Sequence, residues 1–218
     1  TVFLALFVAS AFITSQTAFA DGATAASING EVLLHKVSAA ADTWEPISQD
    51  TALQNGDTLK TQKGTCVINY SDQASFSVEE NTTLTVDTKT ESQDLMLLIG
   101  KIKGKVNKQN AQQPFGVNTP AAVATVRGTE VDFSFNDKNE LLVDLHNGQI
   151  EVVNDDAELK LNLAGKKSIT VHYDMELNKI LLRNECGSEG PVEFSILGAD
   201  YSSAPCETKE VELATAEG

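Results

Sequence analysis

The chain has 218 residues, of which 41% are hydrophobic, and its 31 acidic and 16 basic residues give a formal net charge of −15. This length is enough for one large domain with a proper core. The excess of negative charge argues against nucleic acid and anionic membrane surfaces as partners, and it is typical of a soluble secreted domain.

The first twenty residues carry no charge and predict an N-terminal signal peptide. Residues 1–13 are almost wholly apolar, a polar stretch follows, and Ala-Phe-Ala at residues 18–20 fits the small-residue rule for cleavage. A membrane anchor is the alternative, but this apolar stretch is shorter than the roughly 20 residues that a bilayer needs. We therefore expect residues 1–20 to be removed and residues 21–27 to form a linker. The mature chain is expected to be periplasmic or secreted, without stable membrane insertion.

From Ile28 onward, short β-forming runs alternate with turn residues, and no long stretch keeps the apolar period of a helix. This pattern predicts a single all-β domain, either a twisted β-solenoid or a jelly-roll-like double sheet. Asn147-Gly148 predicts a two-residue hairpin. Gly30, Gly100 and Gly148 each open a run after a turn, a loose echo that fits stacked short strands. The runs are Ile28–Leu34, Thr65–Tyr70, Ser75–Val78, Thr83–Val86, Asp94–Ile99, Lys101–Val106, Thr129–Phe135, Glu140–His146, Gln149–Val153, Glu158–Leu163, Ser168–Tyr173, Lys179–Leu182 and Val192–Leu197.

One motif combines a small-residue apolar run with a charged turn. It starts at Thr119-Pro120 and continues through Arg127-Gly128-Thr129-Glu130 into an alternating strand. Three further elements accompany it: Trp44-Glu45-Pro46 followed by Asn55-Gly56-Asp57-Thr58-Leu59-Lys60-Thr61, then Leu97-Leu98-Ile99-Gly100-Lys101-Ile102, and finally Leu163-Ala164-Gly165-Lys166-Lys167. Taken in order, these elements resemble the FecR family, a bacterial cell-envelope signalling domain, over about residues 28–173.

The resemblance implies a non-enzymatic, exported module that binds or signals in the bacterial envelope through contact with an envelope protein of unknown identity. It also favours the solenoid arrangement. In the family's best-known form, a cytoplasmic helical segment that regulates a sigma factor and a membrane helix precede this periplasmic domain. The sequence shows neither, so an adaptor or scaffold is expected. Two alternatives stay open: an extracellular polysaccharide-binding or matrix module, and the periplasmic half of an anti-sigma regulator that begins upstream of Thr1.

The motif residues are expected to be structural. The resemblance implies that Trp44 covers one end of the β core, and the alternative is a platform on which a sugar stacks. Pro120 suits a strand start or an edge, and Gly128 suits a change of direction at positive φ. The full set of expected structural residues is Trp44, Pro46, Gly56, Asp57, Thr119, Pro120, Arg127, Gly128, Thr129 and Glu130.

Arg127 is the unusual member of the motif, because a guanidinium in an apolar context must reach solvent or find a carboxylate. We expect a carboxylate to hold it, and the candidates in order of preference are Glu130, Asp132 and Asp57. The ranking follows distance along the chain across a tight turn at Gly128.

The three cysteines are at positions 66, 186 and 206. In an oxidising compartment Cys186 and Cys206 are expected to form a disulfide that closes a C-terminal β extension, residues 174–206. Cys66 lies in a strand pattern and is expected to be a buried core thiol, although a pairing that involves it stays open. Residues 207–218 are acidic and predict a disordered tail.

No pattern predicts catalysis, a metal site or a cofactor. Serine-nucleophile elbows, His-Glu-x-x-His and Cys-x-x-Cys motifs are absent from the sequence. Gly165-Lys166-Lys167-Ser168 lacks the earlier glycine of a phosphate loop, and it lies between strands. The three histidines, His35, His146 and His172, are widely separated. The polar stretch from Asn136 to Glu140 lacks the glycine and the spacing of a calcium loop and is expected to be a solvated hairpin.

Overall fold

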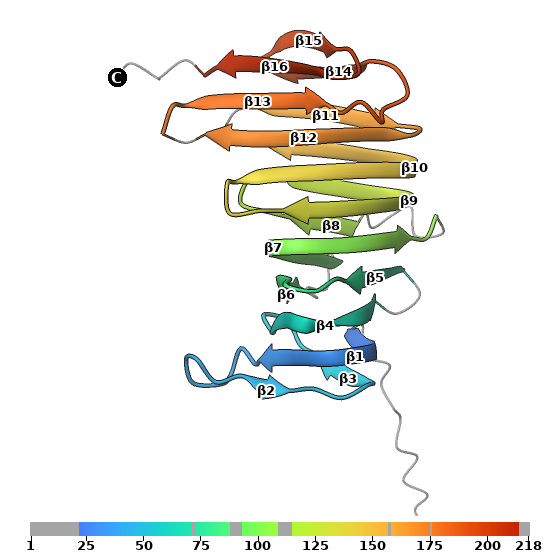
Figure 1. The fold of residues 1–218 in the computed structure, drawn as a ribbon, viewed down its shortest axis with the longest axis vertical. Helices are drawn as coiled ribbons and strands as arrows, with labels where there is room; N and C mark the ends of the chain where they lie inside the picture. Colours follow the sequence, from blue (N-terminus) through green and yellow to red (C-terminus); the bar gives the residue numbers. More distant parts are fainter. Residues whose placement is uncertain are drawn as a thin grey trace, which may run out of the picture.

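The computed structural model describes residues 22–70, 73–87, 93–108, 115–156, 158–174 and 176–213. All regular secondary structure within these ranges is β-strand, which confirms the predicted all-β class (Figure 1). The predicted signal peptide, residues 1–20, lies outside the described residues. The strands are β1 (Ala23–His35), β2 (Glu45–Pro46), β3 (Thr51–Leu53), β4 (Thr58–Tyr70), β5 (Ala74–Val78), β6 (Thr83–Asp87), β7 (Gln93–Val106), β8 (Phe115–Asn118), β9 (Val123–Phe135), β10 (Glu140–Asn154), β11 (Leu159–Ala164), β12 (Lys167–Asp174), β13 (Lys179–Asn184), β14 (Val192–Ile196), β15 (Ala199–Ser203) and β16 (Glu207–Glu212).

Five long strands, β1, β4, β7, β9 and β10, are shared between two layers. Each has 13 to 15 residues, and most pair with different neighbours through their two halves. The first half of β10 pairs with β12 and its second half with β11. Likewise β7 pairs with β6 through its first half and with β5 through its second half. The short strands β2, β6, β8, β11, β14 and β15 therefore complete a first layer, and β3, β5, β12, β13 and β16 complete a second.

Glycines mark the bends at which the long strands pass from one layer to the other. Gly30 of β1 lies opposite Gly64 of β4. Gly100, Gly128 and Gly148 have φ values of 108°, 60° and 107°, which residues with a side chain rarely adopt. The echo of glycines seen in the sequence thus marks bends inside continuous strands.

The predicted hairpin at Asn147-Gly148 is wrong, because β10 continues through both residues without reversing direction. The pair instead lies where the register between β9 and β10 shifts, in a β-bulge. The chain reverses earlier, between β9 and β10, where the backbone amide of Asn136 donates to the backbone carbonyl of Glu140 at 3.2 Å.

One hydrophobic core fills the space between the layers. Inward and outward positions alternate along the strands, as the pleat requires. Phe115 of the first layer contacts Tyr70 and Phe76 of the second, with ring centroids 4.8 Å apart in both pairs. These aromatic contacts join the two layers directly.

Strand order along the stack largely follows chain order, from β2 and β1 at one end to β14 and β15 at the other. Figure 1 shows this stack with β1, β2 and β3 at one end and β14, β15 and β16 at the opposite end. The arrangement therefore combines the sequential stacking of a solenoid with the two facing layers of a double sheet.

Two segments that the sequence predicted as a linker and a disordered tail contain strands. Residues 23–27 of the predicted linker belong to β1, because the small residues Ala23 and Ala25 fit inward-facing positions that are almost fully buried. The predicted disordered tail begins with β16, which pairs with β13. Val211 packs against the core, and Lys179 of β13 forms ion pairs with two glutamates of β16. Residues 214–218 lie outside the described residues.

Among the described residues, no helix has the length and apolar character to cross a membrane.

Candidate functional site

The Arg127-Gly128 motif forms a bulge in β9. Gly128 and Thr129 together oppose the single residue Gly148 of β10. A Cβ atom added to Gly148 would lie 2.4 Å from Cγ2 of Thr129, so only glycine lets the two strands approach this closely. The bulge directs the first half of β9 into one layer and its second half into the other.

Arg127 is exposed and makes no ion pair with any residue that the structure describes. Its cross-strand neighbour is Gln149, whose own neighbour on β11 is Ala164. The expectation that a carboxylate holds Arg127 is therefore wrong. The reason is the bend at Gly128, which leaves Arg127 in the first layer and carries the candidate partners Glu130 and Asp132 into the second.

Each of the three candidate carboxylates has neighbours other than Arg127. Asp132 lies 3.5 Å from Nζ of Lys101 and 3.3 Å from Nε2 of His146. Glu130 is exposed and opposes Asn147 on β10. Asp57 lies far along the stack.

Asp57 is almost fully buried and links two loops near the N-terminal end of the stack. Its carboxylate accepts hydrogen bonds from the backbone amides of Val37 at 3.1 Å and Gln54 at 2.9 Å. The preceding Gly56 has a φ of 85° and donates its amide to the Val86 carbonyl. In the structure, this pair fixes loops around β4.

Thr119 and Pro120 form the turn between β8 and β9. The Thr119 hydroxyl donates to the Ala122 carbonyl at 2.8 Å and accepts from the Ala122 amide at 3.0 Å. Pro120 is exposed in this turn and lies outside both strands. The turn thus sets where β9 begins.

Trp44 lies on the outside of the first layer and does not cover the core. Its ring is half-buried and contacts the His35 ring at 5.6 Å, and Nζ of Lys60 lies 5.8 Å from its centroid. Pro46 ends the two-residue edge strand β2 opposite Leu33. A short edge strand that contains proline limits pairing with other chains.

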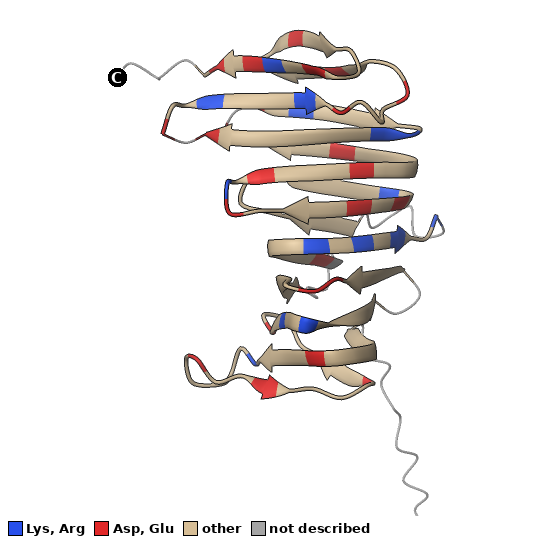
Figure 2. Cartoon of the chain, viewed as in Figure 1, with Lys and Arg blue, Asp and Glu red and all other residues tan. Residues whose placement is uncertain are grey.

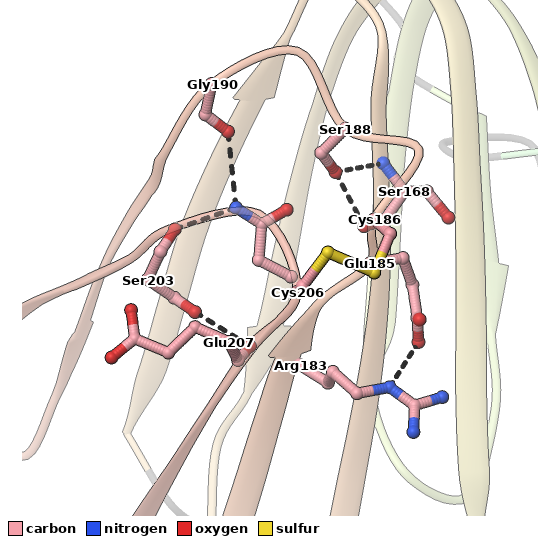
Figure 3. Close-up of a disulfide and its surroundings, with 10 residues drawn as sticks. Ser168, Arg183, Glu185, Cys186, Ser188, Gly190, Ser203, Cys206 and Glu207 are labelled. Atoms are coloured by element: carbon pink, nitrogen blue, oxygen red, sulfur yellow. Dashed lines mark hydrogen bonds and ion pairs between the residues drawn. A yellow bond between two sulfur atoms is a disulfide. The ribbon is translucent and has the colours of Figure 1, made fainter.

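Two of the three cysteines form a disulfide at the C-terminal end of the stack. The structure joins Cys186 and Cys206 in a disulfide, with Cα atoms 4.4 Å apart (Figure 3). Cys186 follows β13 and Cys206 precedes β16, so each lies where the chain crosses between layers. Cys66 is free and buried, and this burial raises the pKa of its thiol to about 12. It therefore stays protonated and unreactive at neutral pH.

Two adjacent clefts share Arg127. One, of about 400 Å³, lies over β9, β10 and β11, and its polar lining includes Thr125, Gln149, Glu151 and Asn162. The other, of about 710 Å³, lies at the bend between the layers, where the long strands cross. We name it the Arg127 edge, and its lining is Lys108, Arg127, Gly128, Asn147, Gly148, Gln149, Ala164 and Gly165.

The Arg127 edge lies in the most basic part of an acidic chain. Between Asp94 and Glu130 the sequence has no carboxylate and contains Lys101, Lys103, Lys105, Lys108 and Arg127. Figure 2 shows the basic bands along β7. Lys101 and Lys103 are matched by Asp132 and Glu79, and the hydrogen bond from Lys103 to Glu79 raises the Lys103 pKa. Within the part of the chain that the structure describes, the other three cations form no ion pair.

Sequence reasoning identified Arg127 and Gly128 but missed Lys108, Gln149 and Asn162. A count of charge along the chain would have found the basic segment. The amides carry no such signal, because only the pairing of β9, β10 and β11 brings them beside Arg127.

Residues 57–151 match the family described as FecR protein. This part of the chain is therefore similar to the FecR family. This confirms the resemblance, and the matched segment includes both Asp57 and the Arg127-Gly128 bulge.

Two crystal structures of one protein from Parabacteroides distasonis ATCC 8503, described provisionally as an anti-sigma factor, are similar to this chain at 18% sequence identity and a TM-score of 0.49. Each match covers 59% of this chain and 59% of that one. No curated protein matches.

The structure gathers none of the side chains that the sequence raised as candidates for metal binding. His35 accompanies Trp44, His146 lies beside Asp132, and His172 is on β12. Across the described ranges, no group of three or more His, Cys, Asp or Glu side chains is placed to hold a metal ion. Gly165 and Lys166 form a turn between β11 and β12, and Nζ of Lys167 donates to the carbonyls of Glu189 and Pro191.

Proposed function

We propose that this protein is an exported, non-enzymatic signalling module of the bacterial envelope that works by binding another protein. The similarity to the FecR family supports a regulatory role, and the two-layer stack offers a rigid surface on which a partner can bind. The observation that carries the proposal is the Arg127 edge. Its arginine forms no ion pair with any described residue, and it lies in a cleft inside the segment that matches the FecR family.

An exposed arginine costs little when solvated, so its presence alone indicates no function. Arg127 differs because it lies in a concave, polar surface beside Gln149 and a second cation, Lys108. Arginine is enriched among the residues that dominate binding energy in protein interfaces. Its planar fork offers several hydrogen-bond donors that no described carboxylate satisfies.

The matched test compares the only two arginines of the chain. The mature protein, beginning at Asp21, is immobilised as wild type, Arg127→Ala and Arg183→Ala, and each form is incubated with envelope extract from the source bacterium. We expect a partner that the wild type and Arg183→Ala retain and Arg127→Ala loses. Equal capture by all three forms would place the interface elsewhere.

A polysaccharide-binding module is the second candidate, because Trp44 lies on the outer surface and leaves the core to other residues. The ammonium of Lys60 lies over the ring and would have to move before a sugar could stack there. Affinity electrophoresis in gels that contain envelope polysaccharide tests this candidate. Retardation of the wild type that Trp44→Ala abolishes would favour it over the protein-binding proposal.

A further inference from the structure

Arg127 and Arg183 differ in whether their guanidinium group pairs with a described carboxylate. Nε of Arg183 lies 2.6 Å from Oε1 of Glu185, whereas Arg127 pairs with no described residue. Residues 109–114, which the structure does not describe, read Gln-Asn-Ala-Gln-Gln-Pro and contain no carboxylate. That stretch therefore cannot supply the missing counter-ion.

The neighbours of Arg127 in its cleft are hydrogen-bonding side chains and glycines. Gln149 opposes it directly, and Asn147 lines the same cleft. Gly128, Gly148 and Gly165 also line this cleft, and all three have positive φ. Only Gly165 has open space where a side chain would lie, so a ligand can approach the backbone closely there. Lys108 and Thr129 fill the corresponding space at Gly128 and Gly148.

Lys108 places a second positive charge in the same cleft. Its side chain lies over Gly128, since a Cβ on Gly128 would come within 2.4 Å of Cγ of Lys108. Two cations that share a polar cleft attract an anionic group, and the arginine fork can bind a carboxylate through two parallel hydrogen bonds.

The net charge restricts which anion can approach. At −15, the whole chain repels long polyanions such as nucleic acid, and the basic edge offers only two lining cations. Glu151 lies in the adjoining cleft, diagonally across from Arg127. It disfavours a second negative charge at that point. A short segment with a single carboxylate, flanked by neutral or basic residues, meets all these conditions.

We infer that the Arg127 edge binds a carboxylate side chain carried by an extended segment of the partner protein. Arg127 binds both carboxylate oxygens, Lys108 adds a second positive charge, and Gln149 donates from its amide. Glu151 selects against a second acidic residue nearby. This inference rests on the proposed protein-binding function and specifies the chemistry that the partner must present.

The test uses the mature protein labelled with ¹⁵N and two short capped peptides. One has the sequence Thr-Thr-Glu-Thr-Lys, and the other replaces its glutamate with glutamine. We expect the glutamate peptide to shift the amide signals of Gly128, Gly148 and Gly165 and the Nε signal of Arg127. The glutamine peptide should leave them in place.

Substitutions then locate the binding. Arg127→Gln should lower the affinity for the glutamate peptide by about tenfold or more, which is the loss expected for one charge-assisted bidentate contact. Arg127→Lys should bind the peptide more tightly than Arg127→Gln but more weakly than the wild type. Lys108→Gln should have a severalfold lower affinity than the wild type. The matched control Arg183→Gln should leave the affinity unchanged. Because Arg127 is exposed, these variants should keep the wild-type pattern of remaining signals.

Three results would overturn the inference: equal shifts from both peptides, binding that survives Arg127→Gln, or cleft shifts with inorganic phosphate and none with the glutamate peptide. The proposed function fails separately, when Arg127→Ala still captures the same envelope protein as the wild type. If Arg127→Ala loses the captured protein but neither peptide shifts the cleft signals, the proposed function stands and the inference of a carboxylate ligand is rejected.

Discussion

The Arg127 edge and the C-terminal cap, which we define as residues 183–207, are both places where the chain crosses between the layers. At the cap, a disulfide joins the two crossing segments and Arg183 pairs with Glu185 (Figure 3). The side-chain amide of Asn184 also donates to two backbone carbonyls. At the edge, the strands bend at glycines, and Arg127 pairs with no residue that the structure describes.

This difference assigns the two regions different roles: the cap stabilises the fold, and the edge is available for binding. Most polar side chains of the cap donate to or accept from other groups of the cap, so these hydrogen bonds are made inside the protein. The Asn184 amide nitrogen lies 2.7 Å from the Ser203 carbonyl and 3.2 Å from the Gly190 carbonyl. At the edge, Arg127 lines two clefts and pairs with no described residue, so its donors are available to another molecule. The comparison predicts that substitutions at the cap affect folding and that substitutions at the edge affect binding.

The largest effect is expected from removing the disulfide. Replacing Cys186 and Cys206 together with alanine should lower the free energy of unfolding by about 3 kcal/mol, because the bond closes a loop of about twenty residues in the unfolded chain. Denaturant titration of the oxidised wild type and the double variant measures this difference. An unchanged midpoint, or peptide mapping that finds Cys66 in the linkage, would remove the cap from the comparison.

A smaller loss is expected at the buried amide of the cap. Asn184→Ala leaves the carbonyls of Gly190 and Ser203 without their donor and should cost about 1–3 kcal/mol. Asn162→Ala is the matched control, because this asparagine lies exposed in the cleft beside Arg127. Its cost should stay below about 0.5 kcal/mol. Equal losses in thermal unfolding would contradict the contrast between the two regions.

The smallest effects are expected at the two arginines. Arg183→Ala breaks an ion pair whose arginine side chain is 55% exposed, and it should cost at most about 1 kcal/mol. Arg127→Ala breaks no pair and should change stability by less than about 0.5 kcal/mol. Parallel denaturation curves compare them. A marked loss with Arg127→Ala would restore the structural role that the sequence first suggested.

The sequence predicted the strands better than their connections. Alternation of apolar and polar residues located Asp94–Ile99 and Lys101–Val106, but the structure joins them through Gly100 into β7. Glycine at positive φ is compatible with a turn and with a bend in a continuous strand. Only the pairing of both halves with neighbours decides between the two, and that pairing depends on contacts distant in sequence.

The same limit applies to the site. The Arg127-Gly128 motif was visible in the sequence, yet its predicted partners were chosen by distance along the chain. A bend at Gly128 separates Arg127 from Glu130 although only two residues lie between them. Short sequence separation implies contact across a hairpin but not across a strand that changes layers. The motif was therefore located correctly and its electrostatic surroundings were not.

The sharing of long strands between layers has a consequence for the order in which the protein assembles. Neighbours in the stack are mostly neighbours in the chain, so each new hairpin can dock on strands that precede it. Local connections of this kind keep the entropy of loop closure low. Because β10 belongs to both layers, it offers template edges for β11 and β12 at once. We expect growth from the N-terminal end, with formation of the disulfide as the final step.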